Sequence, residues 1–188
     1  MVEEKGNNGK SGGGVGLPVG TKIGKYEIVE RRAIGGQAVV YRAHDPLLDR
    51  DVAIKQISTH LAENEQFLQR FRKEAQILAR LGSEQPAVVT IHEMIEDERG
   101  LFIVMEWVGG HTLEATLQDN PGPVDPKAVL RILWRLAAAL HDVHARGVIH
   151  RDLKPSNIII TEGLRPKITD FGVAASGSGQ TSMVLGTT

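Results

Sequence analysis

Cysteine is absent from the 188 residues, which excludes disulfide bonds, thiolate metal sites and a cysteine nucleophile. The chain also lacks a long apolar run, since stretches such as 101–105 and 158–160 are far too short to cross a bilayer. Neither sign of charge dominates: 22 Lys and Arg face 23 Asp and Glu, for a net charge of −1. We therefore expect no nucleic-acid partner, no membrane segment within this chain, and a reducing compartment such as the cytoplasm.

The remaining composition is that of an ordinary globular protein, with 41% hydrophobic and 24% charged residues. Residues 1–24 differ because they are rich in glycine and contain few apolar side chains. Such a segment cannot bury enough apolar surface to offset its ordering entropy. We expect residues 1–24 to form a flexible leader.

The hydrophobic pattern from Lys25 to Trp107 predicts a small sheet that carries one helix. Residues 63–81 have apolar positions at helical spacing, and Gly82 is a candidate for the cap just past the helix end. Short runs with strand character precede and follow this helix, with turn residues between them. The expected strands are 26–30, 38–43, 51–57, 88–95 and 101–107.

A second, mainly helical region follows a predicted hinge at Gly109 and Gly110. Thr112 can cap a short helix, and Asp125 can cap a long helix that starts with a proline. An apolar stripe over residues 129–143 predicts the buried face of that helix, so we assign no chemical role to Trp134, His141 and His144. Two short strands, at 157–161 and 167–169, complete this region.

The stretch 150–157 (HRDLKPSN) and Asp170 carry the side chains with the clearest chemistry. Asp152 can accept a hydroxyl proton, Lys154 can neutralise a phosphoryl group, and Asn157 and Asp170 offer oxygen ligands to Mg²⁺. This set of groups indicates phosphoryl transfer.

These residues resemble motifs in the catalytic domain of eukaryotic-type (Hanks-type) Ser/Thr protein kinases, as do Asp170-Phe171-Gly172 and Val52-Ala53-Ile54-Lys55. The motif sequences look more like those of bacterial members of the family. The resemblance implies an α+β, two-lobed, protein kinase-like fold, with a first lobe at 25–107 and a partial second lobe at 108–188. It also implies ATP and Mg²⁺, and the phosphorylation of Ser/Thr hydroxyls on protein substrates by a non-specific Ser/Thr kinase. Lys154, two residues after the catalytic aspartate, goes with this Ser/Thr specificity.

The resemblance assigns a role to each matching position. It implies that Asp152, Lys154 and Asn157 are catalytic residues and that Asn157 and Asp170 are metal ligands. It also implies that Lys55 binds the phosphates of ATP. Glu74, on the predicted helix, becomes the partner of Lys55. The residues implied to bind the nucleotide are Gly35, Gly36, Val40, Ala53, Lys55, Glu74, Met105, Glu106 and Val108. We expect Ala53 to face away from Ile54 and Lys55 and to leave room for a flat ring.

The glycine-rich loop departs from the family pattern. Counted back from Val40 without a gap, the three glycine positions fall on Ala33, Gly35 and Ala38, so only the middle glycine is kept. Arg32 then occupies a position that is normally aliphatic and covers the adenine. A shifted frame would pair Ile34 with Gly35 but shorten the loop by two residues, and the sequence leaves both frames open.

Three further expectations concern the loops. His150 and Phe171 should pack with Leu78 and Ile91 in a column between the lobes, rather than act on protons. Thr181 and Ser182 are candidate phosphoacceptors whose phosphate Arg151 would bind, although residues 176–188 also fit an ordinary mobile loop.

The resemblance ends at residue 188, within the activation segment. The family normally continues through further helices, so we expect a C-terminally incomplete domain with one face of the long helix uncovered. We also expect this chain by itself to be a poorly active, association-prone fragment. An alternative function is a nucleotide-binding pseudokinase or scaffold module that transfers no phosphate.

Overall fold

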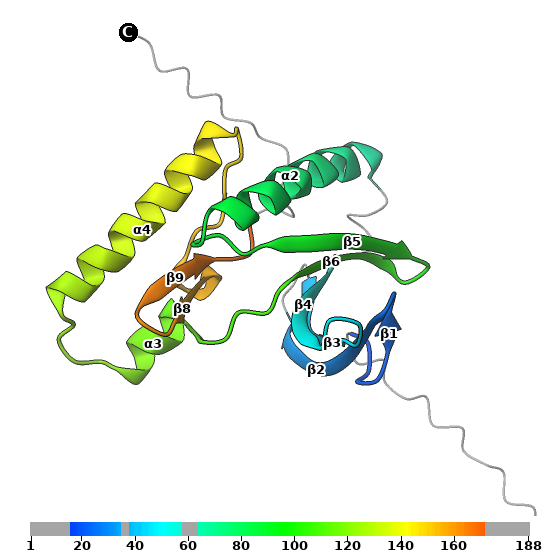
Figure 1. The fold of residues 1–188 in the computed structure, drawn as a ribbon, viewed down its shortest axis with the longest axis horizontal. Coiled ribbons are helices and arrows are strands. Elements are labelled where there is room, and N and C mark those ends of the chain that lie inside the picture. Colours follow the sequence, from blue (N-terminus) through cyan, green and yellow to red (C-terminus); the bar gives the residue numbers. More distant parts are fainter. Residues whose placement is uncertain (1–15, 35–37, 58–63, 172–188) are drawn as a thin grey trace, which may run out of the picture.

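The computed structural model describes residues 16–34, 38–57 and 64–171, and its main feature is a curled antiparallel sheet (Figure 1). The six strands lie in the order β1-β2-β3-β4-β6-β5. β2, β3 and β4 form the expected meander, and β5 and β6 the expected hairpin. The strands are β1 (Lys22–Ile23), β2 (Tyr26–Ile34), β3 (Ala38–Asp45), β4 (Arg50–Ile57), β5 (Ile91–Asp97) and β6 (Gly100–Glu106).

The sheet begins earlier in the chain than the sequence predicted, and strand β5 begins later than predicted. Ile23 in β1 is fully buried and pairs with Tyr26, so residues 22–23 belong to the sheet although we expected the leader to run to residue 24. Residues 1–15 lie outside the described residues. The strand expected from Val88 starts at Ile91, because Val88 instead forms a parallel bridge to Ile168.

Helix α2 (Glu65–Glu84) packs on this sheet, as its apolar spacing predicts. Asn64 caps its start, where the side-chain oxygen accepts a hydrogen bond of 2.9 Å from the Phe67 amide. The expected cap at Gly82 is wrong, since the helix continues past it and Gln85 is the C-cap. Gly82 is needed inside the helix because a Cβ there would lie 2.7 Å from the Cα of Thr90.

The second region contains two helices and a small sheet of three strands in the order β7-β8-β9. Its elements are β7 (His111–Thr112), α3 (Leu113–Asp119), α4 (Pro126–Ala145), a 3-10 turn (Pro155–Asn157), β8 (Ile158–Thr161) and β9 (Arg165–Ile168). The predicted N-caps are confirmed, since Thr112 accepts from the Ala115 amide and Asp125 from the Lys127 amide.

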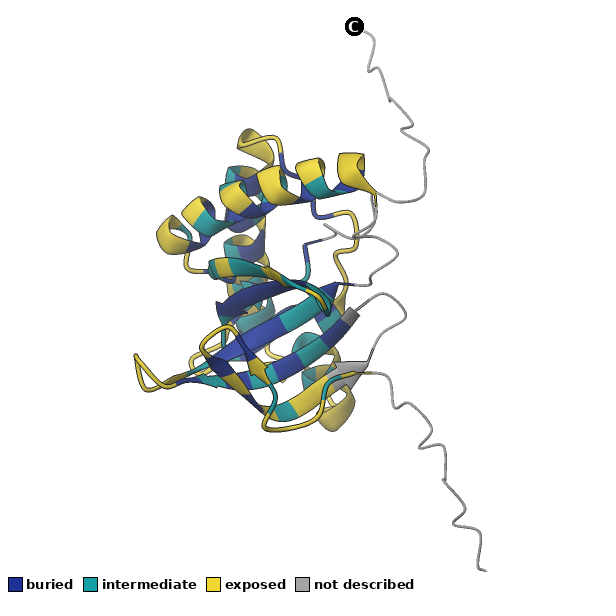
Figure 2. Ribbon diagram, turned by 90° about the vertical axis from the view of Figure 1, so that its right-hand side faces the viewer, coloured by how far each residue is buried: buried dark blue, intermediate teal, exposed yellow. Residues whose placement is uncertain are grey.

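Two hydrophobic clusters form the core, one on each face of the central strands. Along β4, Val52 and Ile54 enter one cluster, while Ala53 enters the other. Ala53 and Lys55 therefore share a face, and the expectation that they lie on opposite faces is wrong, because side chains alternate along a strand. Figure 2 shows the buried positions gathered in the strands, while the outer turns of the helices are exposed.

One cluster continues from the sheet into the second region and joins the two. Backbone hydrogen bonds reinforce this join: the Val89 amide donates to Ile168 O at 3.0 Å, and the Ile168 amide to Ala87 O at 2.8 Å. The Gln85 side chain also donates to Asp142 on α4 at 2.5 Å. The segment after α2 is thus fixed to β9 and α4, which sets the position of α2 relative to the catalytic loop.

Helix α4 has one face that the described residues do not cover. Leu136 and Val143 of the predicted stripe are buried, but Leu133 is 54% exposed and Leu130 and Trp134 are 66% and 74% exposed. The uncovered face that we expected is therefore present. No helix among the described residues is long and apolar enough to span a membrane.

Candidate active site

Lys55 and Asp170 meet at the centre of the site. Lys55 lies on β4 of the six-stranded sheet, and Asp170 lies two residues after β9 of the three-stranded sheet. The packing of the two regions therefore brings together side chains that are 115 positions apart in the chain. Lys55 Nζ lies 2.6 Å from Asp170 Oδ1, with the lysine side chain 15% exposed. A strong, partly buried ion pair therefore closes the inner end of the cleft.

Asp152 is held by both of its predicted neighbours. Lys154 Nζ lies 2.8 Å from Asp152 Oδ2, and Asn157 Nδ2 donates to the backbone oxygen of Asp152 at 2.8 Å and to Oδ2 at 3.2 Å. The hydrogen bond from Lys154 lowers the pKa of Asp152, and the same contact raises the pKa of Lys154. Asp152 is therefore an ionised hydrogen-bond acceptor at neutral pH, and it is half exposed to an incoming substrate.

His150 is a buried side chain that connects the loop to Thr169. Burial lowers its pKa, so the ring is neutral at pH 7. Its Nδ1 accepts from the Asp152 amide at 3.3 Å, which leaves Nε2 to donate to Thr169 O at 2.9 Å. The ring also packs on Phe171 with centroids 4.6 Å apart, and Phe171, Leu78 and Ile91 line one small cavity of about 30 Å³. The expected column is present.

Glu74 does not make the ion pair that the resemblance implied. Its Oε1 lies 3.2 Å from Arg151 Nη2, while Lys55 is held by Asp170. The expected contact between Lys55 and Glu74 is absent from the ion pairs of the described residues. Arg151, the expected partner of a phosphate, is therefore bound to Glu74. The candidate phosphoacceptors Thr181 and Ser182 lie outside the described residues.

A cleft of about 240 Å³ extends from Asp170 to the connection between the two regions. Predicted nucleotide-binding residues that line it are Val40, Ala53, Met105, Glu106 and Val108. The amide of Val108 has no hydrogen-bond partner among the described residues, so it is available to a ligand. Gly110 (φ +140°) is required at the mouth, where a Cβ would lie 2.3 Å from Ile160 O. Gly35 and Gly36 lie outside the described residues.

Several cleft residues were missed by the sequence analysis. Ser156, Ile159 and Thr169 also line the cleft. Ser156 lies within the stretch 150–157 and Thr169 next to Asp170, so their position beside the motifs was the available signal, whereas Ile159 resembles an ordinary strand residue. Arg32 was noted only as a departure from pattern, yet it lines the cleft, and its guanidinium carbon lies 5.4 Å from the Trp107 ring centre. The strands on either side of the glycine-rich loop are also placed. β2 runs to Ile34, β3 starts at Ala38, and Ala33 lies opposite Val40.

Two of the four non-glycine residues with positive φ among the described residues lie next to the reactive groups, and the other two, Asp49 and Leu164, lie in hairpin turns. Arg151 (φ +63°) and Asp170 (φ +55°) both adopt the left-handed conformation that non-glycine residues rarely take. Such strain persists only where surrounding contacts impose it, here the bonds of His150 to Thr169 and of Lys55 to Asp170. The two loops therefore hold Asp152 and Asp170 in fixed positions.

The donor set fits a hard divalent cation. The Thr169 amide donates to Asn157 O at 3.0 Å, which keeps the Asn157 and Asp170 segments adjacent. Asn157 uses its amide nitrogen toward Asp152, so its side-chain oxygen remains free, and Asp170 keeps a second carboxylate oxygen beyond the one bound to Lys55. Amide and carboxylate oxygens are the ligands that Mg²⁺ prefers. No group of three or more His, Asp or Glu side chains among the described residues offers another metal site.

The curled sheet with one helix, the joined helical region and the loop aspartates between them define a protein kinase. The family model for the protein kinase domain matches residues 26–188, and the chain belongs to this family. The α+β, two-lobed type of fold inferred from the resemblance is confirmed, with an incomplete second lobe. Members of the family use ATP and a divalent metal ion.

Curated relatives are bacterial Ser/Thr kinases. The chain is 40% identical over 164 residues to "Serine/threonine-protein kinase PrkC" of Bacillus subtilis, covering 87% of this chain and 25% of the relative. It is 40% identical over 167 residues to "Serine/threonine-protein kinase PknL" of Mycobacterium tuberculosis, covering 87% of this chain and 41% of the relative. The chain thus spans well under half the length of these relatives.

A solved structure has the same fold. The crystal structure of the M. tuberculosis PknI kinase domain is 30% identical and superposes with a TM-score of 0.74, covering 85% of this chain and 63% of that chain. The agreement extends over most of the described residues.

Proposed function

We propose that the chain is the catalytic part of a Ser/Thr protein kinase that transfers a phosphoryl group from ATP to Ser or Thr hydroxyls of proteins, with Mg²⁺. The observation that carries this proposal is the meeting of Lys55 and Asp170 at 2.6 Å, at the end of a cleft whose neighbouring loop presents an ionised Asp152. The names of the curated relatives support the same activity.

The side chains suit separate parts of this reaction. The Asp152 carboxylate, ionised because Lys154 donates to it, accepts the hydrogen bond of the substrate hydroxyl and orients its oxygen toward the phosphoryl group. Lys55 and Lys154 provide positive charge on two sides of the transferred group. Asn157 and Asp170 would hold Mg²⁺, which when bound neutralises the charge on the phosphates.

The adenine end of the cleft suits a purine. Ala53 and Met105 supply apolar walls, and the free amide of Val108 offers one hydrogen bond. From Glu106 only the carbonyl oxygen can serve a ligand, because its amide donates to Thr90 O at 2.9 Å and its side chain is bound by Lys167 at 2.6 Å. No observation favours the alternative of a binding module without transfer, and the curated relatives are named Ser/Thr protein kinases.

The decisive experiment is the Asp152→Asn variant. The substitution keeps the shape and removes the charge, so kcat for labelled phosphate transfer to a Ser/Thr peptide mixture should fall by about 100-fold or more. The affinity for Mg-ATP should change little, because Asp152 contacts the hydroxyl substrate.

A matched control is Asp119→Asn at the exposed end of α3, which should keep full activity. Unchanged transfer by Asp152→Asn would refute the assignment. Thermal stabilisation by Mg-ATP without transfer, measured on a protein that carries the whole kinase domain, would instead establish the binding module.

A further inference from the structure

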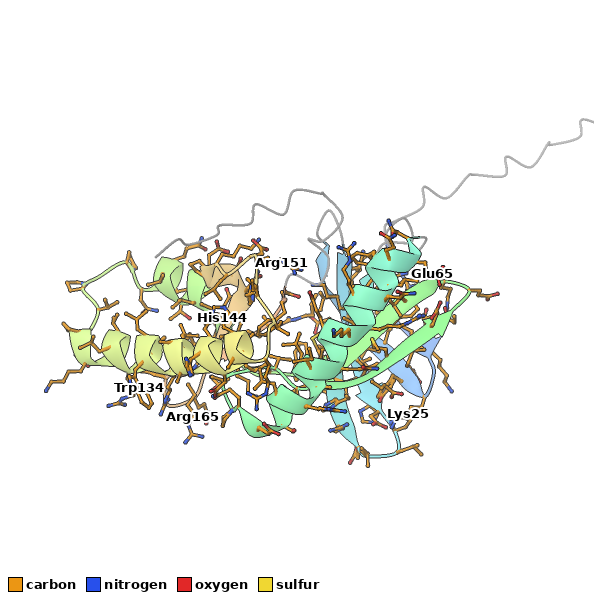
Figure 3. All side chains as sticks on the ribbon, turned by 90° about the horizontal axis from the view of Figure 1, so that it is seen from above. Lys25, Glu65, Trp134, His144, Arg151 and Arg165 are labelled. Carbon is orange, nitrogen blue, oxygen red and sulfur yellow. The ribbon has the colours of Figure 1, made fainter. Side chains whose placement is uncertain are left out.

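A second groove lies apart from the nucleotide cleft, between α4, the β8–β9 hairpin and the segment that follows α2. Its volume is about 600 Å³, and it shares no lining residue with the cleft. We call it the back groove, and define it by its lining residues Gln85, Pro86, Ala87, Trp134, Arg135, Ala138, Thr161, Arg165, Pro166 and Lys167. In Figure 3, Trp134 on α4 and Arg165 on β9 project on the same side of the molecule.

The groove has an apolar surface with one large exposed side chain. Trp134 is 74% exposed, and Pro86, Ala138 and the buried Pro166 continue the apolar lining. Our sequence analysis gave Trp134 no role because it expected a core position. An exposed tryptophan beside a groove is typical of the anchor residues that dominate protein interfaces.

The charge of the groove is entirely positive. Arg135, Arg165 and Lys167 line it, and no carboxylate does. The charge of Lys167 is satisfied by Glu106 at 2.6 Å, whereas Arg135 and Arg165 have no ion pair with a carboxylate among the described residues. Arg135 instead donates to the backbone oxygen of Leu164 at 3.3 Å, which holds its guanidinium across the groove.

Several arginines elsewhere meet carboxylates, as in the pairs Arg42–Asp51, Arg72–Glu96, Arg99–Asp97 and Arg146–Glu84, whereas Arg70, Arg80 and Arg131, like Arg135 and Arg165, have no carboxylate partner among the described residues. Arg135 and Arg165 differ from these three because both line one groove that has no carboxylate among its described lining residues. Planar guanidinium groups bind carboxylates in a bidentate manner, so the groove matches an acidic partner.

We propose that the back groove binds an acidic peptide segment of a partner protein. An apolar side chain of that segment packs against Trp134, and its carboxylates pair with Arg135 and Arg165. The back groove and the nucleotide cleft share no lining residue, and the ion pair between Lys167 and Glu106 lies between them.

The probe is a short, labelled synthetic peptide in which glutamates flank one leucine, with binding followed by fluorescence anisotropy at physiological salt. Arg165→Glu and Trp134→Ser should each weaken binding about tenfold, because each removes an anchor from the groove. Both side chains are exposed, so the thermal midpoint should stay unchanged. A saturating ATP analogue should not compete with the peptide.

The matched control is Arg80→Glu on α2, an exposed arginine that also lacks a carboxylate partner among the described residues and gives the same change of net charge. It should leave binding unchanged. Equal weakening by Arg80→Glu would show that only diffuse charge attracts the peptide, and would overturn the proposal. Equal binding of a peptide with glutamines for glutamates, or tighter binding of a single-stranded oligonucleotide, would overturn it as well.

Discussion

Glu74 lies against Arg151, with 3.2 Å between Oε1 and Nη2, while the lysine that it was expected to meet is bound to Asp170. The two ion pairs place the carboxylates of Glu74 on α2 and of Asp170 after β9 on different cations. Each of these charged groups therefore has a partner within the protein.

Lys55→Met tests the central ion pair. The variant leaves Asp170 without its cation and removes charge stabilisation from the phosphates, so phosphate transfer should fall by about 100-fold or more. Mg-ATP affinity, measured by calorimetry, should also weaken. Lys73→Met, at an exposed position of α2, is the matched control and should behave like the unmodified protein. Retained transfer in Lys55→Met would remove Lys55 from the site.

Lys154 sets the protonation of Asp152. In the folded protein the pKa of Asp152 is lowered by the hydrogen bond from Lys154, so the carboxylate stays ionised below the pH at which an ordinary aspartate is protonated. Lys154→Met should raise that pKa toward its usual range, which carboxyl NMR titration would detect. In the pH profile of kcat/KM, the acidic limb should move to higher pH. Lys127→Met, on the exposed first turn of α4, should move neither.

Two histidines make stability depend on pH. The pKa of His150 and of His92 is lowered mainly by burial, so the unfolded chain takes up protons at a higher pH than the folded one. The free energy of unfolding should be largest above the ordinary histidine pKa of about 6.5, and should fall as the pH drops below it. Urea titrations between about pH 5 and 8 would measure this slope.

His150→Phe separates the contribution of the catalytic loop. It should flatten the slope, and it should lower stability at pH 8 by about 1–3 kcal/mol because Thr169 O loses its donor. His141→Gln, at an exposed position of α4, should change neither quantity. A slope that is unchanged in His150→Phe would show that folding does not lower the pKa of His150.

Gly82→Ala tests why a glycine lies inside α2. Alanine favours a helix by about 1 kcal/mol over glycine, but the new Cβ would lie 2.7 Å from Thr90 Cα and 3.0 Å from Val89 O. Both neighbours are backbone atoms and cannot rotate away, and overpacking costs about 1–3 kcal/mol. The variant should therefore be less stable by thermal or urea unfolding. Ser83→Ala, at the exposed neighbouring position, is the control, and a stabilised Gly82→Ala would contradict this account.

The periodic elements were predictable because their causes are local. Alternating and helical spacing of apolar residues gave the strands of the main sheet and helices α2 and α4, and the caps Thr112 and Asp125 follow from side chains adjacent in sequence. Gly82 misled the analysis because its requirement comes from Thr90, on another segment. Local pattern does not contain that contact.

By itself, the sequence determined the reactive groups: Lys55, Asp152, Lys154, Asn157 and Asp170 could be named from residue type and spacing, because a motif fixes which functional groups a short segment carries. Only the tertiary structure decided which of them pair. Lys55 meets Asp170 and Glu74 meets Arg151 because the anchoring of residues 85–89 to β9 and α4 sets where α2 lies. The same packing left Trp134 exposed beside Arg135 and Arg165, two arginines without a carboxylate partner among the described residues. Ion pairs and grooves depend on distances between distant segments, and those distances are fixed only when the elements pack.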